Sequence, residues 1–143
     1  MDNDYLIVTA SFLEDKKYAG HARENSLVEI DCLPPYGAGD GYSDLELLLI
    51  SFSSSVCLSL SEFLKNQRKK DVKSVNAQAK GYVRDEDPKV ISRIELELFI
   101  ASPDTEGLEL GEALKALEDR LCPVWVMLKA AGARITVLFE LSR

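Results

Sequence analysis

Apolar and polar residues alternate most regularly between Val90 and Ala101. The apolar positions are Ile94, Leu96, Leu98 and Ile100, and the charged positions between them are Glu95 and Glu97. A period of two residues is typical of a strand with one buried face. The run Val72 to Val83 predicts a second strand, and the polar turn Arg84-Asp-Glu-Asp-Pro88 would join the two strands as a hairpin.

The segment from Ser43 or Asp44 to about Lys69 predicts a long helix, because either residue can cap its N-terminus. The helix is apolar on nearly all sides between Leu45 and Leu60, so we expect it to lie inside the protein, covered on several sides. This apolar run is shorter than the roughly 20 residues that a membrane span needs. It also contains Glu46 and several serines. We therefore expect a buried helix and no contact with a membrane.

The C-terminal part of the chain predicts two helices and a strand. Leu108 to Leu121 has apolar residues at helical spacing. Pro123 marks the start of the next helix, because proline is well tolerated at the first helical position. That helix would continue to Ala131 and stop at Gly132. Arg134 to Leu141 is the last expected strand.

The N-terminal part predicts two strands and a loop. Asp4 to Leu13 is rich in β-branched and aromatic residues, and Gly20 would separate it from a second strand in His21 to Asp31. Leu33 to Gly41 is rich in proline and glycine and predicts a loop. The resulting order, β-β-α-β-β-α-α-β, indicates an α+β fold. A length of 143 residues favours a single domain over residues 1–143.

Composition excludes several classes of function. A net charge of −7 argues against nucleic-acid binding, which needs a basic face. The three cysteines are widely spaced, and His21 is the only histidine, so neither a disulfide framework nor a zinc site is expected. The acidic N-terminus lacks the basic and apolar regions of a signal peptide. We therefore expect a protein of the reducing cytoplasm with no bound metal.

The step Cys122-Pro-Val124 carries the clearest candidate chemistry. If Pro123 starts a helix, Cys122 lies at or near its N-cap, where free amide groups and the helix dipole favour a thiolate. The alternative is a small buried cysteine between two helices, because free cysteine is often a core residue. Trp125, at helical spacing from Leu121 and Leu128, is expected in the core.

Three stretches together resemble the OsmC/Ohr family of bacterial thiol-dependent peroxide reductases, which act in oxidative stress. They are Leu27 to Asp31 with the Pro/Gly-rich loop that follows, Glu46 to Ser55, and Cys122-Pro-Val124 with its helix and final strand. The resemblance covers nearly the whole chain. It implies an intertwined homodimer with two central helices buried at its core and sites formed between subunits. It implies no cofactor.

The resemblance also implies a two-cysteine reaction. In the family, a thiolate on the central helix attacks the peroxide and becomes a sulfenic acid, and the cysteine at the position of Cys122 then forms a disulfide with it. Here the attacking position falls on Ser55, and Cys57 lies two residues further on. Two residues turn an α-helix by about 200° and raise it by about 3 Å, so Cys57 would point away from Cys122. A bulge in the serine-rich helix would be needed to bring it round.

An arginine and a glutamate support the attacking sulfur in the family. Arg23 and Lys17 lie in the segment that supplies the arginine, and Leu45 occupies the glutamate position, with Glu46 beside it. Cys32 lies in the loop before the central helix and is a further candidate partner for Cys122.

Three hypotheses remain open. The protein is a peroxide reductase that uses Cys122 with Cys57 or Cys32 in a rearranged geometry. Alternatively, it is a non-catalytic OsmC-like dimer that binds a small apolar or thiol ligand between its subunits, or a stable scaffold. A third hypothesis is one-cysteine chemistry at Cys122, which needs an external thiol.

Overall fold

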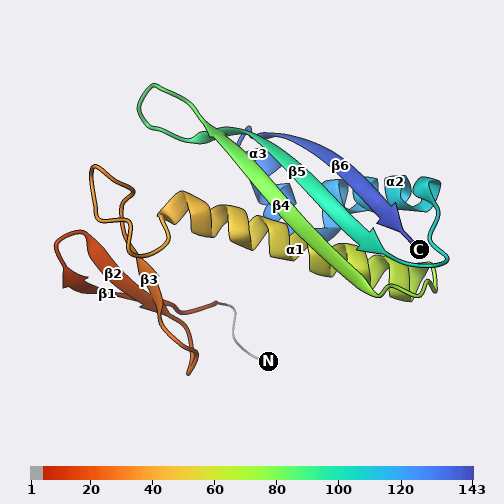
Figure 1. Ribbon diagram of the computed structural model, residues 1–143, viewed down its shortest axis with the longest axis horizontal. Helices are drawn as coiled ribbons and strands as arrows, with labels where there is room; N and C mark the ends of the chain where they lie inside the picture. The colour runs from red at the N-terminus through yellow and green to blue at the C-terminus, as the bar shows by residue number, and fades with distance from the viewer. Residues whose placement is uncertain (1–4) are drawn as a thin grey trace. The chain divides into compact units, whose positions relative to one another are not determined.

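The computed structural model describes residues 5–143 and has the predicted mixture of helices and strands (Figure 1). It forms two compact units, which divide after Leu48. The elements are β1 (Thr9–Glu14), β2 (Lys17–His21), β3 (Val28–Ile30), α1 (Asp44–Gln67), β4 (Ser74–Val83), β5 (Ile91–Ala101), α2 (Gly107–Ala116), η1 (Leu117–Leu121), α3 (Pro123–Ala130) and β6 (Arg134–Ser142). The α+β class is therefore confirmed.

The first unit contains three strands where the sequence predicted two. They form an antiparallel sheet in the order β1-β2-β3. The expectation that Gly20 separates two strands is wrong, because Gly20 lies within β2, opposite Ala10 on one side and Val28 on the other. The chain turns instead at Asp15, whose φ of 48° is left-handed, so the first strand ends at Glu14, one residue beyond the predicted Leu13. The predicted start of that strand, Asp4, lies outside the described residues.

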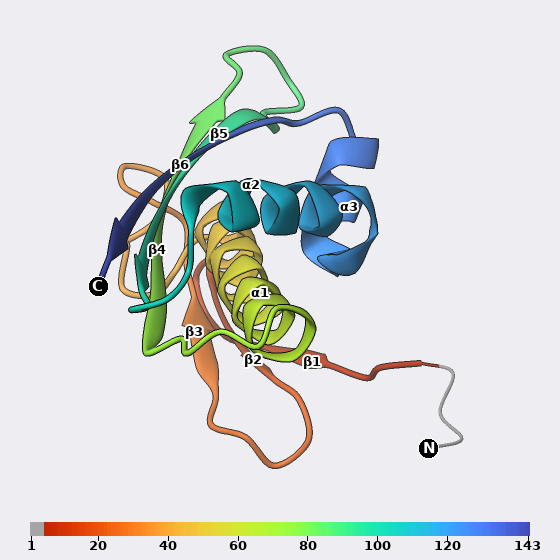
Figure 2. The ribbon, with the colours of Figure 1, turned by 90° about the vertical axis from the view of Figure 1, so that its right-hand side faces the viewer.

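The second unit is built on the β4-β5-β6 sheet. β5 lies in the middle, antiparallel to β4 and parallel to β6. The alternation in β5 is confirmed, since its four apolar residues Ile94, Leu96, Leu98 and Ile100 are all buried. Figures 1 and 2 show α1, α2 and α3 on one face of this sheet, where the buried residues form a single hydrophobic cluster. The predicted hairpin between β4 and β5 is also confirmed.

Helix α1 contributes one stripe to this core. Its buried residues follow helical spacing and are Phe52, Val56, Leu60, Phe63 and Leu64. On other sides of the helix Leu58 is 64% exposed and Ile50 is 48% exposed. Within one chain α1 is thus covered along one stripe, which differs from the expectation of cover on several sides. By length and composition α1 is a candidate membrane span, but core helices of soluble proteins pass the same test.

The helical segment before Cys122 changes its geometry part-way. The sequence predicted one helix from Leu108 to Leu121, but α2 ends at Ala116 and η1 continues as a π-helical turn. In a π-helix each N–H bonds to the carbonyl five residues earlier, so the chain accommodates one extra residue per turn. Helix α3 begins at Pro123 as predicted. Gly132 follows it with a φ of +100°, a conformation that suits glycine.

Candidate functional site

Cys122 lies at the corner between η1 and α3. It is the N-cap of α3 and has extended backbone angles, with φ −98° and ψ 107°. Its N–H donates to the carbonyl of Leu117 at 3.0 Å, and its own carbonyl accepts from the N–H of Val126 at 3.0 Å. The predicted N-cap position is therefore confirmed, and hydrogen bonds on both sides fix the backbone that carries the sulfur.

The side chain of Cys122 contacts Ser55 of α1. The two residues are 67 positions apart in the sequence, and Ser55 Oγ lies 3.2 Å from Cys122 Sγ. Either group can act as the donor of this hydrogen bond. Cys122 makes no capping hydrogen bond with α3, and its sulfur contacts Ser55 of α1 instead.

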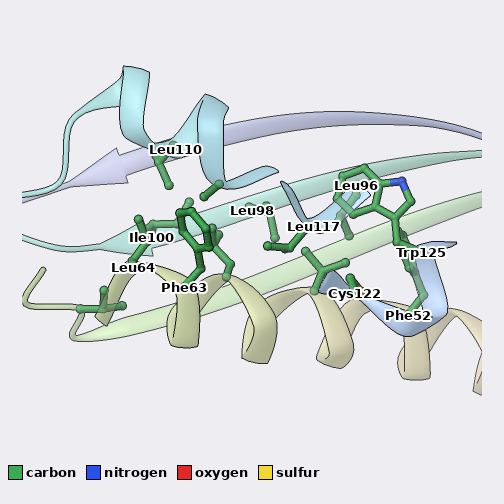
Figure 3. Packing of buried hydrophobic residues seen from close by; sticks show 14 of the residues in the cluster. Phe52, Phe63, Leu64, Leu96, Leu98, Ile100, Leu110, Leu117, Cys122 and Trp125 are labelled. Carbon is green, nitrogen blue, oxygen red and sulfur yellow. The ribbon is translucent and has the colours of Figure 1, made fainter. Parts of the chain in front are cut away.

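The surroundings of this pair are apolar. Cys122 is fully buried and belongs to the same cluster as Leu117, Phe52 and Trp125, all labelled in Figure 3. Among residues 49–143, no charged side chain lies within hydrogen-bond or ion-pair distance of Ser55 or Cys122. The nearby cations that activate many catalytic cysteines are thus not supplied by this unit. In the part of the chain that the structure describes, no group of His, Cys, Asp and Glu side chains is arranged to hold a metal ion.

The other two cysteines differ from Cys122 in their surroundings. Cys57 is partly buried on α1, and this burial raises the pKa of its thiol above the ordinary 9.0. It lies two residues beyond Ser55, which corresponds to a turn of about 200° around a regular helix. The structure therefore brings Ser55, and not Cys57, to the Cys122 sulfur. Cys32 is an exposed free cysteine of the first unit.

The candidate supporting residues lie in the first unit and have other contacts there. Glu46 forms a capping box with Ser43: its carboxylate accepts from the Ser43 N–H at 2.8 Å, and its own N–H donates to Ser43 Oγ at 3.2 Å. Lys17 forms an ion pair with Asp40. Arg23 is exposed in the turn between β2 and β3, with a φ of 57°.

Sequence reasoning missed the organising role of Asp31. This carboxylate is buried and accepts hydrogen bonds from the N–H groups of Cys32 at 2.7 Å and of Ala38 and Asp40 at 3.2 Å. Burial alone would raise its pKa, but these three donors outweigh burial and hold the pKa below the ordinary 3.8. An aspartate directly before a Pro/Gly-rich loop was the available signal, because aspartate side chains often bond to nearby backbone amides.

Comparison with known proteins places this geometry in a family. The family model described as OsmC-like protein matches residues 37–137, which is more than half of the chain. This chain belongs to the OsmC-like protein family. Its match includes α1, Ser55 and Cys122. No curated protein matches the chain significantly.

Solved structures of similar fold support the assignment. An OsmC-like protein from Mycoplasma pneumoniae superposes with a TM-score of 0.83 at 18% identity, over 100% of both chains. A hypothetical protein from Aquifex aeolicus gives 0.82 at 20% identity, over 98% of both chains. The organic hydroperoxide resistance protein OhrB of Bacillus subtilis gives 0.60 at 19% identity, over 96% of this chain and 98% of its own. These likenesses show that the OsmC-like fold is shared.

Proposed function

We propose that this OsmC-like protein is a cytoplasmic homodimer related to the thiol-dependent hydroperoxide reductases, and that it has lost their intramolecular disulfide cycle. The observation that carries the proposal is the 3.2 Å contact between Ser55 Oγ and Cys122 Sγ. In the reaction that the family resemblance implies, a second sulfur stands opposite Cys122. Here a hydroxyl occupies that place.

The substitution removes the chemistry and keeps the packing. A thiolate attacks a hydroperoxide oxygen, becomes a sulfenic acid and then condenses with a second thiol, releasing water. Serine cannot enter this sequence, because its hydroxyl forms neither a sulfenic acid nor a disulfide. Cys57 is a poor substitute: burial raises its pKa, so it forms less of the reactive thiolate, and it lies on another side of α1 from Ser55.

The buried, apolar surroundings of Cys122 favour a non-catalytic role for the retained site. Such a role would be the binding of a small apolar or thiol ligand at the subunit interface, which is the alternative hypothesis from the sequence.

A second candidate is one-cysteine reduction. Cys122 would attack the hydroperoxide, giving an alcohol and a sulfenic acid, and an external thiol would reduce that acid. This candidate uses Cys122 as the only reacting thiol, so it is compatible with the hydroxyl that Ser55 places opposite the sulfur.

The exposed apolar residues of each unit support the homodimer. Leu58 and Ile50 are exposed on α1, and the first unit exposes Ile7, Val8 and Phe12. Extended apolar surface of this kind commonly marks a contact with another protein surface. Sedimentation equilibrium of the purified protein should give twice the 15.9 kDa chain mass. A monomer at micromolar concentration would contradict the assembly.

The redox part of the proposal is tested by thiol titration. The reduced protein is treated with one equivalent of an organic hydroperoxide, and each cysteine is followed by peptide mass mapping. Three unchanged thiols support the non-catalytic role. Oxidation of Cys122 alone, reversed by an added thiol, favours the one-cysteine candidate. A rapid disulfide between Cys122 and either Cys57 or Cys32 would overturn the proposal.

A further inference from the structure

The complete burial of Cys122 means that a solute reaches its sulfur only when the surrounding structure opens. The corner that carries the sulfur is bounded by two irregular backbone positions. Cys122 itself is extended before α3, and Gly132 has a φ of +100° after it. These two positions bound the eight-residue helix α3.

Two kinds of contact hold this corner closed. On the inner side, Leu117 of η1 and Trp125 of α3 are buried in the hydrophobic cluster. On the outer side, Lys129 of α3 forms an ion pair with Glu118 of η1, with Nζ and Oε2 2.7 Å apart. The hydrogen bond that Lys129 donates to Glu118 is the main reason that the pKa of Lys129 is raised above 10.5.

The Glu118–Lys129 pair differs from its neighbours because it crosses the corner. Its two residues are 11 positions apart and Cys122 lies between them, so the pair ties η1 to α3. The adjacent pair Lys115–Asp119 joins α2 to η1 with a separation of four residues and does not span Cys122. Both pairs are partly exposed, so the structure contains a matched internal control.

We propose that the Glu118–Lys129 ion pair is a latch that controls access to the Cys122 sulfur by holding α3 against the π-helical turn. Breaking the pair frees the outer side of the corner and raises the population of an open state in which α3 has moved away. The latch concerns access and not peroxide chemistry, so it stands whether or not the proposed function is correct.

The test measures alkylation of Cys122 in the full-length reduced protein with iodoacetamide, followed by peptide mass mapping. When labelling is slow relative to reclosing, the rate is proportional to the population of the open state. Glu118→Gln and Lys129→Gln should each accelerate labelling of Cys122 by about two- to fivefold, the size expected of a partly exposed ion pair. Lys115→Gln is the matched control and should leave the rate near that of the wild type; Asp119 is kept because its charge also acts on Lys129.

Three further readouts separate a latch from general destabilisation. Lys129→Arg keeps the ion pair and should restore the wild-type rate. Added salt should accelerate labelling in the wild type and have little effect in Glu118→Gln, because salt screens an exposed pair. The labelling rate of Cys57 should stay unchanged in every variant. Equal rates in the latch and control variants, or a parallel rise at Cys57 and Cys122, would overturn the proposal.

Discussion

Trp125 meets Phe52 edge to face, with ring centroids 5.9 Å apart and planes at 87°. Phe52 precedes Ser55 by three residues on α1, and Trp125 follows Cys122 by three residues on α3. The aromatic contact therefore joins the same two helices as the Ser55–Cys122 contact, about one helical turn away from it. It fixes the distance between the two elements that carry the candidate site.

Removing this aromatic contact should destabilise the fold strongly. Phe52 is fully buried, so we expect Phe52→Ala to lower the free energy of unfolding by about 3–5 kcal/mol through lost burial and a cavity. Urea unfolding followed by tryptophan fluorescence measures the change. Met127→Ala, on the exposed side of α3, is the control and should change stability by no more than about 0.5 kcal/mol. Equal effects of the two substitutions would contradict the packing described here.

Substitutions of the two side chains in the capping box of α1 should have different effects on stability. Ser43→Ala removes the acceptor for the Glu46 N–H and should cost about 1 kcal/mol of stability. Glu46→Gln keeps an oxygen that accepts from the Ser43 N–H, so it should change stability little. Urea unfolding of both variants measures this difference. If Glu46→Gln alters the peroxide reactivity of the cysteines and leaves stability unchanged, Glu46 has a role beyond capping.

The stability of the folded protein should depend on acid pH through Asp31, which holds the loop after β3. Because the pKa of Asp31 is lower in the folded protein than the ordinary 3.8, the folded state binds fewer protons there than the unfolded state. Its contribution to stability is therefore present above pH 3.8 and is lost as the pH falls through the folded pKa. Asp31→Asn should lower stability at neutral pH and flatten the acid dependence below about pH 4.

Other carboxyl groups titrate in the same range, so the comparison uses the difference between Asp31→Asn and the wild type. Urea unfolding at a series of acid pH values gives this difference. If the difference in the free energy of unfolding between Asp31→Asn and the wild type stays constant down to low pH, the loop hydrogen bonds to Asp31 do not contribute to stability.

The elements that the sequence predicted well are those whose local pattern and tertiary surroundings agree. The alternation in β5 matches a sheet with one buried face, and Pro123 and Gly132 mark the two ends of α3. Two features were not predicted. Gly20 lies inside β2 because that strand is paired on both sides, although glycine is a weak strand residue. The π-helical turn had no local signal, since the sequence of η1 continues the amphipathic pattern of α2.

The candidate site was only partly predictable from the residues. Cys122 could be placed at a helix N-terminus because the proline after it fixes that position. Its contact with Ser55 spans 67 residues, and no local pattern in the chain specifies it. The family resemblance directed attention to Ser55. The apolar pattern of α1 also predicted more cover than one chain provides, because Leu58 and Ile50 are exposed.

The most direct test of the account restores a sulfur at position 55. Because Ser55 Oγ lies 3.2 Å from Cys122 Sγ, Ser55→Cys should place two thiols close enough to form a disulfide after a small adjustment. Ser54→Cys is the matched control, since Ser54 is exposed on α1 and bonds to Ser51 of its own helix. Each reduced protein receives one equivalent of organic hydroperoxide and is mapped by mass spectrometry. The account predicts a peroxide-dependent disulfide to Cys122 in Ser55→Cys and none in Ser54→Cys or the wild type. The same disulfide chemistry in the wild type, or none in Ser55→Cys, would contradict it.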